Sequence, residues 1–274
     1  LSLPLSCRLS KMAGLKLGIM TATTREYEKI AHMVDGANKE VRGGVTYVDG
    51  EIYDRRVTVC RSDIGKVCAA ISTTVLLDRY ECDAIIFVGS AGGLFNGCKI
   101  GDIVIGTELV QHDMDCSPLM DKLILPSLDI ARLPVKPEVT QFMFDAASSL
   151  VQSQEFKKVL AKPGVSEELG ITAPKVHKGV IVTGDKFVAT AATRDGIMSA
   201  IPDAYVAEME GAAMAQVCYT WGAPYAVVRA VSDECDNHID FNKFCDLIVG
   251  DVMEMLVKTI LQDPQGRLDT VFGK

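Results

Sequence analysis

Residues 207–233, AEMEGAAMAQVCYTWGAPYAVVRAVSD, indicate a helix followed by a buried strand. Glu210 stands at the start of the predicted helix, and Asp233 follows the apolar run at residues 225–231. A continuous apolar run is typical of a parallel strand that is covered on both faces. Because ligand-binding groups gather where parallel strands end, this segment predicts an α/β fold with two acids at its functional edge.

The two acids admit a functional and a structural interpretation. Two carboxyl groups at one sheet edge suit chemistry on a sugar or a base, and burial raises the pKa of a carboxyl group toward the range of a useful proton donor. Asp233 could instead cap the turn after the strand. Glu208 and Glu210 could complement the dipole of the helix. Only the occurrence of these acids together favours a functional role over a structural one.

The same alternation of strands and helices continues outward along the chain. Short runs rich in Val and Ile predict strands at residues 17–20, 57–60, 84–88, 102–105, 179–182 and 225–231. A helix is predicted over residues 64–80, with a buried stripe made of Val67, Ala70, Ile71, Thr74, Val75 and Leu77. One long terminal helix that packs on the sheet is predicted from the spacing of Phe241, Phe244, Cys245, Ile248, Val252, Met255, Leu256 and Ile260.

These elements predict one domain over residues 15–264. The expected architecture is a single-domain, three-layer α/β/α fold with a central mixed, mainly parallel twisted sheet. Residues 1–14 and 265–274 are expected to be tails. Residues 113–137 carry four prolines and are expected to form a surface excursion that serves as a lid or as an oligomer contact.

The composition argues against several classes of protein. The 274 residues carry a formal net charge of -8 with a pI near 5.1 and show no Lys/Arg stripe, so a nucleic-acid partner is not expected. No apolar run reaches the roughly 18 residues of a membrane span. The nine cysteines are scattered and lack a Cys-x-x-Cys pair, which indicates reduced thiols in the cytoplasm rather than disulfides or a zinc site. The four histidines show no metal-ligand spacing.

Three other segments place polar or aromatic residues where strands end. The strand at 84–88 runs into Gly-Ser-Ala-Gly-Gly at 89–93, which is either a turn whose amides approach a ligand or a plain tight turn. Thr23 or Thr24 is expected to cap a helix that puts Glu26 at the same edge, although an acid there commonly serves only the helix dipole. Phe187, after the strand at 179–182, could stack on a flat base or belong to the core.

These motifs occur together in one order along the chain. They are GIMTA at 18–22 followed by Glu26, DIGK at 63–66, GSAGG at 89–93, GDIV at 101–104, TGD at 183–185, EME at 208–210 and VRAVSD at 228–233. Together they resemble the nucleoside phosphorylase/nucleosidase superfamily, and most closely the 5'-methylthioadenosine/S-adenosylhomocysteine nucleosidases. The resemblance covers roughly residues 15–262.

The resemblance implies a role for each candidate residue. Asp233 would protonate N7 of adenine, and Glu26 would orient and deprotonate the attacking water. Glu210 would hold the ribose hydroxyls, while Ser90 would fix Asp233. The remaining expected substrate contacts are Ile64, Ala91, Gly92, Phe187, Val188, Glu208, Met209, Ser232 and Phe241.

The resemblance also bears on the nucleophile. Phosphorylases of the superfamily clamp phosphate with arginines at the positions of Glu26 and Phe87, and neither of these side chains can cradle a dianion. Hydrolysis of 5'-methylthioadenosine or S-adenosylhomocysteine to adenine is therefore implied, without a metal or an organic cofactor. A phosphorylase stays the alternative, because Arg25 adjoins Glu26 and Arg42 resembles a phosphate contact that phosphorylases borrow from a neighbouring subunit.

The expected partners follow from this activity. The resemblance implies a small nucleoside substrate and a homodimer, and no nucleic-acid or membrane partner is expected. A nucleoside-binding protein without turnover is a second alternative. Its sign would be the loss of Glu26, Glu210 or Asp233, and all three are present.

Overall fold

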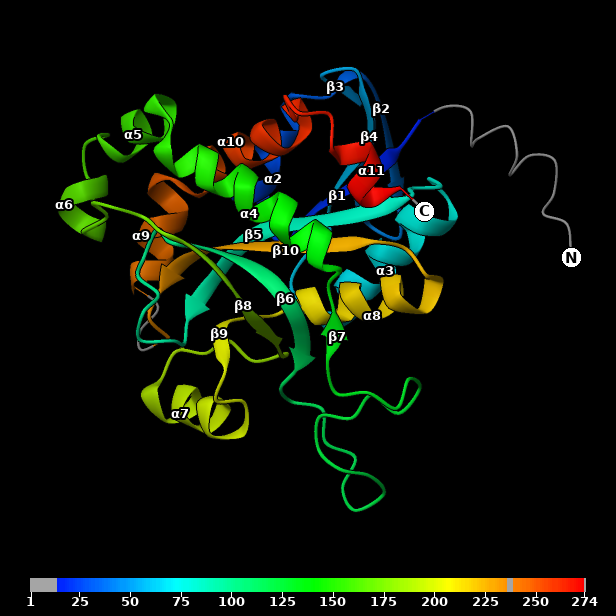
Figure 1. Cartoon of the computed structure of the whole chain (residues 1–274), viewed down its shortest axis with the longest axis vertical. Coiled ribbons are helices and arrows are strands. Elements are labelled where there is room, and N and C mark those ends of the chain that lie inside the picture. Colours follow the sequence, from blue (N-terminus) through cyan, green and yellow to red (C-terminus); the bar gives the residue numbers. More distant parts are fainter. Residues whose placement is uncertain (1–13, 236–238, 274) are drawn as a thin grey trace, which may run out of the picture.

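The computed structural model describes residues 14–235 and 239–273, which form one mixed sheet with helices on its faces (Figure 1). The strands are β1 (Lys16–Thr21), β2 (Asp35–Arg42), β3 (Val45–Ile52), β4 (Arg55–Arg61), β5 (Ala84–Gly93), β6 (Ile103–Gln111), β7 (Leu133–Pro134), β8 (Val176–Thr183), β9 (Ala204–Glu208) and β10 (Tyr225–Asp233). The helices are α2 (Thr24–His32), α3 (Lys66–Asp78), α4 (Pro137–Gln152), α5 (Gln154–Leu160), α6 (Val165–Leu169), α7 (Ala191–Ala200), α8 (Gly211–Trp221), α9 (Ile239–Leu247), α10 (Val249–Gln262) and α11 (Leu268–Phe272).

The sheet has the order β10-β6-β8-β9-β5-β1-β4-β3-β2, and β10 also pairs with β5. Five strands, β5, β10, β6, β8 and β9, therefore close into a ring, and β1 to β4 extend from it. The pairings of β5 with β1 and β10 are parallel, with Met20, Phe87 and Val227 level with one another. These three strands thus end at one edge. The predicted α/β domain with a mixed sheet is confirmed.

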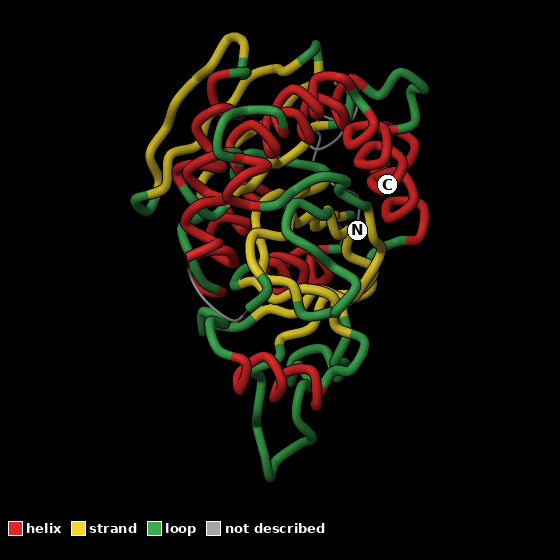
Figure 2. Tube along the Cα trace, turned by 90° about the vertical axis from the view of Figure 1, so that its left-hand side faces the viewer, coloured by secondary structure: helices red, strands yellow, loops and turns green. Residues whose placement is uncertain are grey.

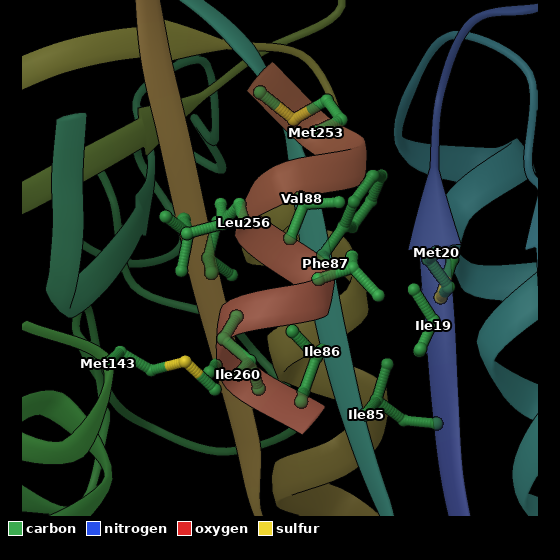
Figure 3. Packing of buried hydrophobic residues seen from close by; sticks show 14 of the residues in the cluster. Ile19, Met20, Ile85, Ile86, Phe87, Val88, Met143, Met253, Leu256 and Ile260 are labelled. Carbon is green, nitrogen blue, oxygen red and sulfur yellow. The ribbon is translucent and has the colours of Figure 1, made fainter. Parts of the chain in front are cut away.

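The core surrounds β5, whose side chains are buried on both faces. Helices α2, α4 and α10 pack together on one side of the sheet, and α3 and α8 pack together on the other. Figure 3 shows residues 85–88 of β5 between Ile19 and Met20 of β1 and Leu256 and Ile260 of α10. Burial of each such side chain contributes roughly 1.5–3 kcal/mol. The central strand β5 is therefore held firmly by the core.

The predicted buried stripe of α3 is wrong for most of its residues, although Leu77 is buried and Val75 packs against the core. Val67 and Ile71 are 68% and 51% exposed, while Ser72, Thr73 and Leu76 face the core. Thr73 tolerates burial because its Oγ1 donates to the carbonyl of Ala69 at 2.7 Å. The helix is apolar on both sides, so the period of its apolar residues could not tell the inner face from the outer one.

The predicted single terminal helix is two helices, α9 and α10, which are separated at Ile248. The apolar spacing continues through the break, which is why the sequence did not reveal it. Gly250 lies against α2, since a Cβ there would be 2.9 Å from the carbonyl oxygen of Arg25. In the segment expected to be a C-terminal tail, α11 buries Leu268 and Phe272 in the main core.

Four strands, β2, β3, β7 and β9, have no counterpart in the prediction. Strand β2 is polar and largely exposed, so it lacks the alternation that marks a strand. It forms a hairpin with β3 that stands out from the body (Figure 2). The expected excursion is present as an irregular segment over residues 112–132, and it forms the long loop at the lower end of Figures 1 and 2.

Candidate active site

A cavity lies where β1, β5 and β10 end. All the residues expected to act on substrate line it, namely Glu26, Ile64, Ser90, Ala91, Gly92, Phe187, Val188, Glu208, Met209, Glu210, Ser232, Asp233 and Phe241. The structure therefore brings together segments that are far apart in the chain. The expected glycine-rich turn after β5 is a continuation of the strand through Gly93, which carries Ser90 and Ala91 to the cavity.

Glu26 is buried in the first turn of α2, and four groups donate to its carboxylate. Oε2 accepts from the amides of Ala22 at 3.2 Å and Thr23 at 2.9 Å. Oε1 accepts from the amide and the Oγ of Ser90, both at 2.9 Å. Thr23 and Glu26 form a capping box, so Glu26 serves the helix end as well as the cavity. Four donors suit the ionised carboxylate, which only accepts.

The contacts of Ser90 correct its expected role. Ser90 was expected to fix Asp233, but its two hydrogen bonds to a site carboxylate go to Glu26. Two of the groups that hold Asp233 come from its own segment: Ser232 Oγ donates to Oδ2 and the Cys235 amide donates to Oδ1, both at 2.8 Å. The sequence could not show which acid Ser90 contacts, because Glu26 and Asp233 both lie at the sheet edge beside β5.

Asp233 is 2% exposed at the end of β10. Its bond from the Cys235 amide is the turn cap that the structural interpretation predicted, so the carboxylate both caps a turn and lines the cavity. A Cβ added to Gly92 would lie 3.0 Å from Asp233 Oδ1 and 2.3 Å from Cys235 Sγ. Glycine at this position therefore lets β5 approach the acid closely.

Arg229 is a site residue that the sequence analysis did not identify. Its side chain is fully buried, forms an ion pair with Glu208, and lies 3.9 Å from Glu210 Oε2. The guanidinium also stacks 4.3 Å from the ring centre of Phe87. An arginine inside the apolar run of β10 was the available signal, because a charge buried there needs partners.

Glu208 has contacts that serve the fold. It accepts from Arg229, from Thr183 Oγ1, and from the amides of Glu210 at 3.1 Å and Gly211 at 2.7 Å. These bonds tie β8, β10 and the start of α8 together. Glu208 lines the cavity, but its carboxylate oxygens bind Arg229 and the first turn of α8.

Glu210 faces the cavity at the N-cap position of α8. Burial raises its pKa to about 8, and the negative charge of Glu208 adds to this increase. The Arg229 charge and the Gly65 amide, which donates to Oε1 at 2.9 Å, oppose the increase. Glu210 is therefore largely protonated at neutral pH and can both donate to and accept from a sugar hydroxyl.

This pKa predicts how stability depends on pH. The folded-state pKa of Glu210 lies above its ordinary value, so its contribution to stability is complete below about pH 4.5 and is lost as the pH rises through about 8. Glu210→Gln removes this titration. We expect the wild type to lose stability relative to the variant across that range, with a slope on the order of 1 kcal/mol per pH unit. Urea denaturation of both proteins at pH 5 to 9 measures the difference, and parallel curves would contradict it.

Phe187 belongs to the apolar wall of the cavity, and its exposure favours ligand contact over a role in the core. Phe187 is 42% exposed and meets Phe241 edge to face, with ring centres 5.3 Å apart. Ile64 is 56% exposed at the rim, whereas Val188 is buried and Met209 is half-buried. A half-open aromatic pair suits a flat base that slides against one ring.

The histidines take no direct part in this cavity within the described chain. Burial lowers the pKa of His112, and His177 bonds to Asp102 at 2.8 Å. His238 lies outside the described residues. Within residues 14–235 and 239–273, no group of His, Cys, Asp or Glu side chains is arranged to hold a metal ion. No helix of the described chain has the length and hydropathy needed to cross a membrane.

Comparisons with known proteins agree with this geometry. A family model described as the phosphorylase superfamily matches residues 16–262. A 5'-methylthioadenosine/S-adenosylhomocysteine nucleosidase of Shewanella sp. (strain W3-18-1) is 33% identical over 232 residues, which are 84% of this chain and 91% of that protein.

Solved structures give the same result. The nucleosidase of this name from Neisseria meningitidis, in complex with methylthio-immucillin-A, has a TM-score of 0.78 and 28% identity, covering 90% of this chain and 98% of its own. Futalosine hydrolase of Helicobacter pylori has a TM-score of 0.75 and 26% identity, covering 92% of this chain and 99% of its own. The chain therefore belongs to the phosphorylase superfamily and, within it, to the family of 5'-methylthioadenosine/S-adenosylhomocysteine nucleosidases.

Proposed function

We propose that the protein hydrolyses the N-glycosidic bond of 5'-methylthioadenosine, S-adenosylhomocysteine or both, releasing adenine and a 5-thio-substituted ribose. Asp233 protonates the purine at N7, and Glu26 activates the attacking water. An N-glycosidic bond breaks when the base leaves as a neutral species and the ribose becomes cation-like. The two nucleosidases named above, from Shewanella sp. and Neisseria meningitidis, carry this activity in their names and support the proposal.

The observation that carries the proposal is the environment of Glu26. A carboxylate held by four donors occupies the place where a phosphorylase would offer a cation to phosphate. Arg229, whose guanidinium lines the cavity, forms an ion pair with Glu208 and stacks on the ring of Phe87. Four carboxyl groups line the cavity beside two cations, Arg229 and Lys186, so acids outnumber cations. The carboxylate of Glu26 disfavours a dianion at the place of the nucleophile and stabilises a ribosyl cation.

Ser90 Oγ gives water a place beside Glu26. Of the four donors to Glu26, three are backbone amides with fixed directions, and Ser90 Oγ is the one that can rotate. Rotation of this hydroxyl frees a lone pair of Oε1 for the proton of a water molecule, while Oγ donates to the oxygen of that water. Glu26 then accepts the proton as the water attacks the sugar.

The two arginines that favoured a phosphorylase have other contacts. Arg25 forms an ion pair with Asp246 on the surface, and Arg42 forms one with Glu40 on the β2–β3 hairpin. Neither is among the described residues that line the cavity. These contacts favour water as the nucleophile.

Phosphate dependence tests the proposed function. Purified protein is incubated with 5'-methylthioadenosine in phosphate-free buffer, and released adenine is measured together with the sugar product. We expect full turnover without phosphate and a free reducing sugar. An obligate requirement for phosphate with a sugar 1-phosphate as product would establish the phosphorylase, and binding without turnover in either buffer would establish the nucleoside-binding protein.

We further propose a cytoplasmic homodimer that forms through the outer faces of α3 and α8. Val67 and Ile71 of α3 and Trp221 of α8 are exposed beside a groove between the two helices. A helix that is apolar all round is normally buried, and contiguous exposed apolar groups mark interfaces. The proposed partner is a second copy of the chain, because the resemblance to the nucleosidases implies a homodimer. Free thiols are present at Cys60, Cys68, Cys82, Cys98, Cys116, Cys218 and Cys245, and a reducing compartment such as the cytoplasm keeps thiols in this state.

Introducing a charge on this face tests the dimer. We expect Ile71→Glu to convert a dimer into a monomer, since the carboxylate would be desolvated in the interface. Sedimentation velocity measures the mass, and Tyr53→Glu in the β3–β4 turn is the matched control, with Tyr53 at 44% exposed. A wild-type monomer, or a dimer in Ile71→Glu, would contradict the proposed interface.

A further inference from the structure

Lys66, Asp113 and Asp185 form a closed ring of hydrogen bonds at the rim of the cavity. Lys66 Nζ donates to Asp113 Oδ1 at 2.6 Å, and the Asp185 amide donates to Asp113 Oδ2 at 2.9 Å. The Lys66 amide donates to Asp185 Oδ1 at 2.8 Å. The ring thus joins the start of α3, the loop after β8 and the first residues of the excursion.

This ring is connected to both substrate-holding parts of the cavity. The amide of Gly65, next to Lys66, donates to Glu210 Oε1 at 2.9 Å, so the start of α3 fixes the carboxyl group that faces the sugar. Asp185 lies two residues before Phe187, the aromatic residue of the base site. The first amides of α3 therefore hold carboxyl groups from two different segments of the site, where the helix dipole favours negative charge.

The excursion is clamped to the same loop by its first residue. The amide of His112 donates to the carbonyl of Thr183 at 3.0 Å. A Cβ at Gly184 would lie 2.3 Å from His112 Nε2, so the imidazole occupies the space beside this glycine. Burial would raise the pKa of Asp113, but its bonds from Lys66 and Asp185 lower it overall, which keeps the carboxylate charged at neutral pH.

We propose that Lys66, Asp113 and Asp185 are positioning residues, here called the latch, that set Glu210 and Phe187 at the spacing that a bound nucleoside requires. The latch acts on binding rather than on the chemical step. The contacts described for Glu26 come from Ser90 and from Ala22 and Thr23, between β1 and α2. Those described for Asp233 come from Ser232 and Cys235. The inference rests on the proposed function, since it assumes that a nucleoside occupies this cavity.

A separation of KM from kcat tests the latch. Lys66→Met removes the bond to Asp113 but keeps the Lys66 amide, so we expect KM for 5'-methylthioadenosine to rise about tenfold while kcat stays within about twofold. Lys66→Arg keeps a cation and should recover most of the loss. Lys122→Met is the matched control, because it removes an exposed ion pair with Asp115 in the same excursion.

Binding without turnover separates the latch from the proposed function. Calorimetry with a 5'-methylthio adenine C-nucleoside, whose base–sugar bond cannot be hydrolysed, should show about tenfold weaker binding in Lys66→Met and in Asp113→Asn, and no further loss in the double variant. Wild-type protein that does not bind this probe would refute the proposed function. Equal affinity in the wild type and both variants, equal loss in Lys122→Met, or a loss confined to kcat would overturn the latch alone.

Discussion

Asp233→Asn is expected to lower kcat by about 10²- to 10⁴-fold while nucleoside binding persists. The amide cannot supply the proton that lets adenine leave as a neutral species. The geometry should survive, because the amide oxygen can still accept from the Cys235 amide, and Ser232 Oγ can donate to the carbonyl of Ala91 at 3.1 Å instead. Adenine release is followed by absorbance, and affinity is measured with the C-nucleoside.

The neighbouring acid supplies the control for this prediction. Glu234 carries the same charge, forms an exposed ion pair with Lys99 at 3.1 Å and is not among the described residues that line the cavity. Glu234→Gln should therefore retain nearly full activity. If Asp233→Asn turned over at a near-normal rate, proton donation would have to come from another group and the assigned mechanism would fail.

Glu26→Gln is expected to produce a loss of similar size, because an amide cannot take the proton of the attacking water. Four donors point at the carboxylate, so the NH₂ of the glutamine must face two of them, at a cost of about 1–3 kcal/mol in stability. The measurement therefore includes thermal unfolding beside kcat. Ser90→Ala should lose less, since the Ser90 amide still donates to Glu26.

A matched change on the same helix controls for charge. Glu28 is exposed on α2, two residues after Glu26, and Glu28→Gln should leave both kcat and the melting temperature nearly unchanged. A Glu26→Gln protein that remains folded and hydrolyses substrate at the wild-type rate would show that another group activates the water. Activity that returned in Glu26→Gln only with added phosphate would point to a latent phosphorylase.

The strands that carry the site were predictable because their sequences are almost entirely apolar. Runs such as 225–231 can only be buried, and the polar residues after them must then emerge at the sheet edge. This is why Glu26, Glu210 and Asp233 were placed in one region before their contacts were known. Both interpretations of these acids describe the molecule, since Glu26 caps α2 and Asp233 caps a turn while each also lines the cavity.

The features that escaped prediction depend on partners distant in the chain. The outer face of α3 has the same apolar character as its inner face, and the break at Ile248 leaves the apolar period intact. Which acid Ser90 serves depends on the pairing of β5 with its two neighbours. The partners of Arg229 and the members of the latch come from separate segments, so the sequence shows the charged residues but not which of them pair.

The place of β5 between β1 and β10 has a consequence for how catalysis can evolve in this chain. The proposed proton donor, Asp233, ends one flanking strand, and the proposed water-activating acid, Glu26, follows the other. Their separation is therefore set by two strand spacings of ~5 Å each. Backbone hydrogen bonds between these strands, rather than a hinge between domains, fix the separation of the two acids. New leaving groups or 5' substituents can therefore be accommodated by exchanging rim residues such as Ile64 and Phe241, with the reactive pair left undisturbed.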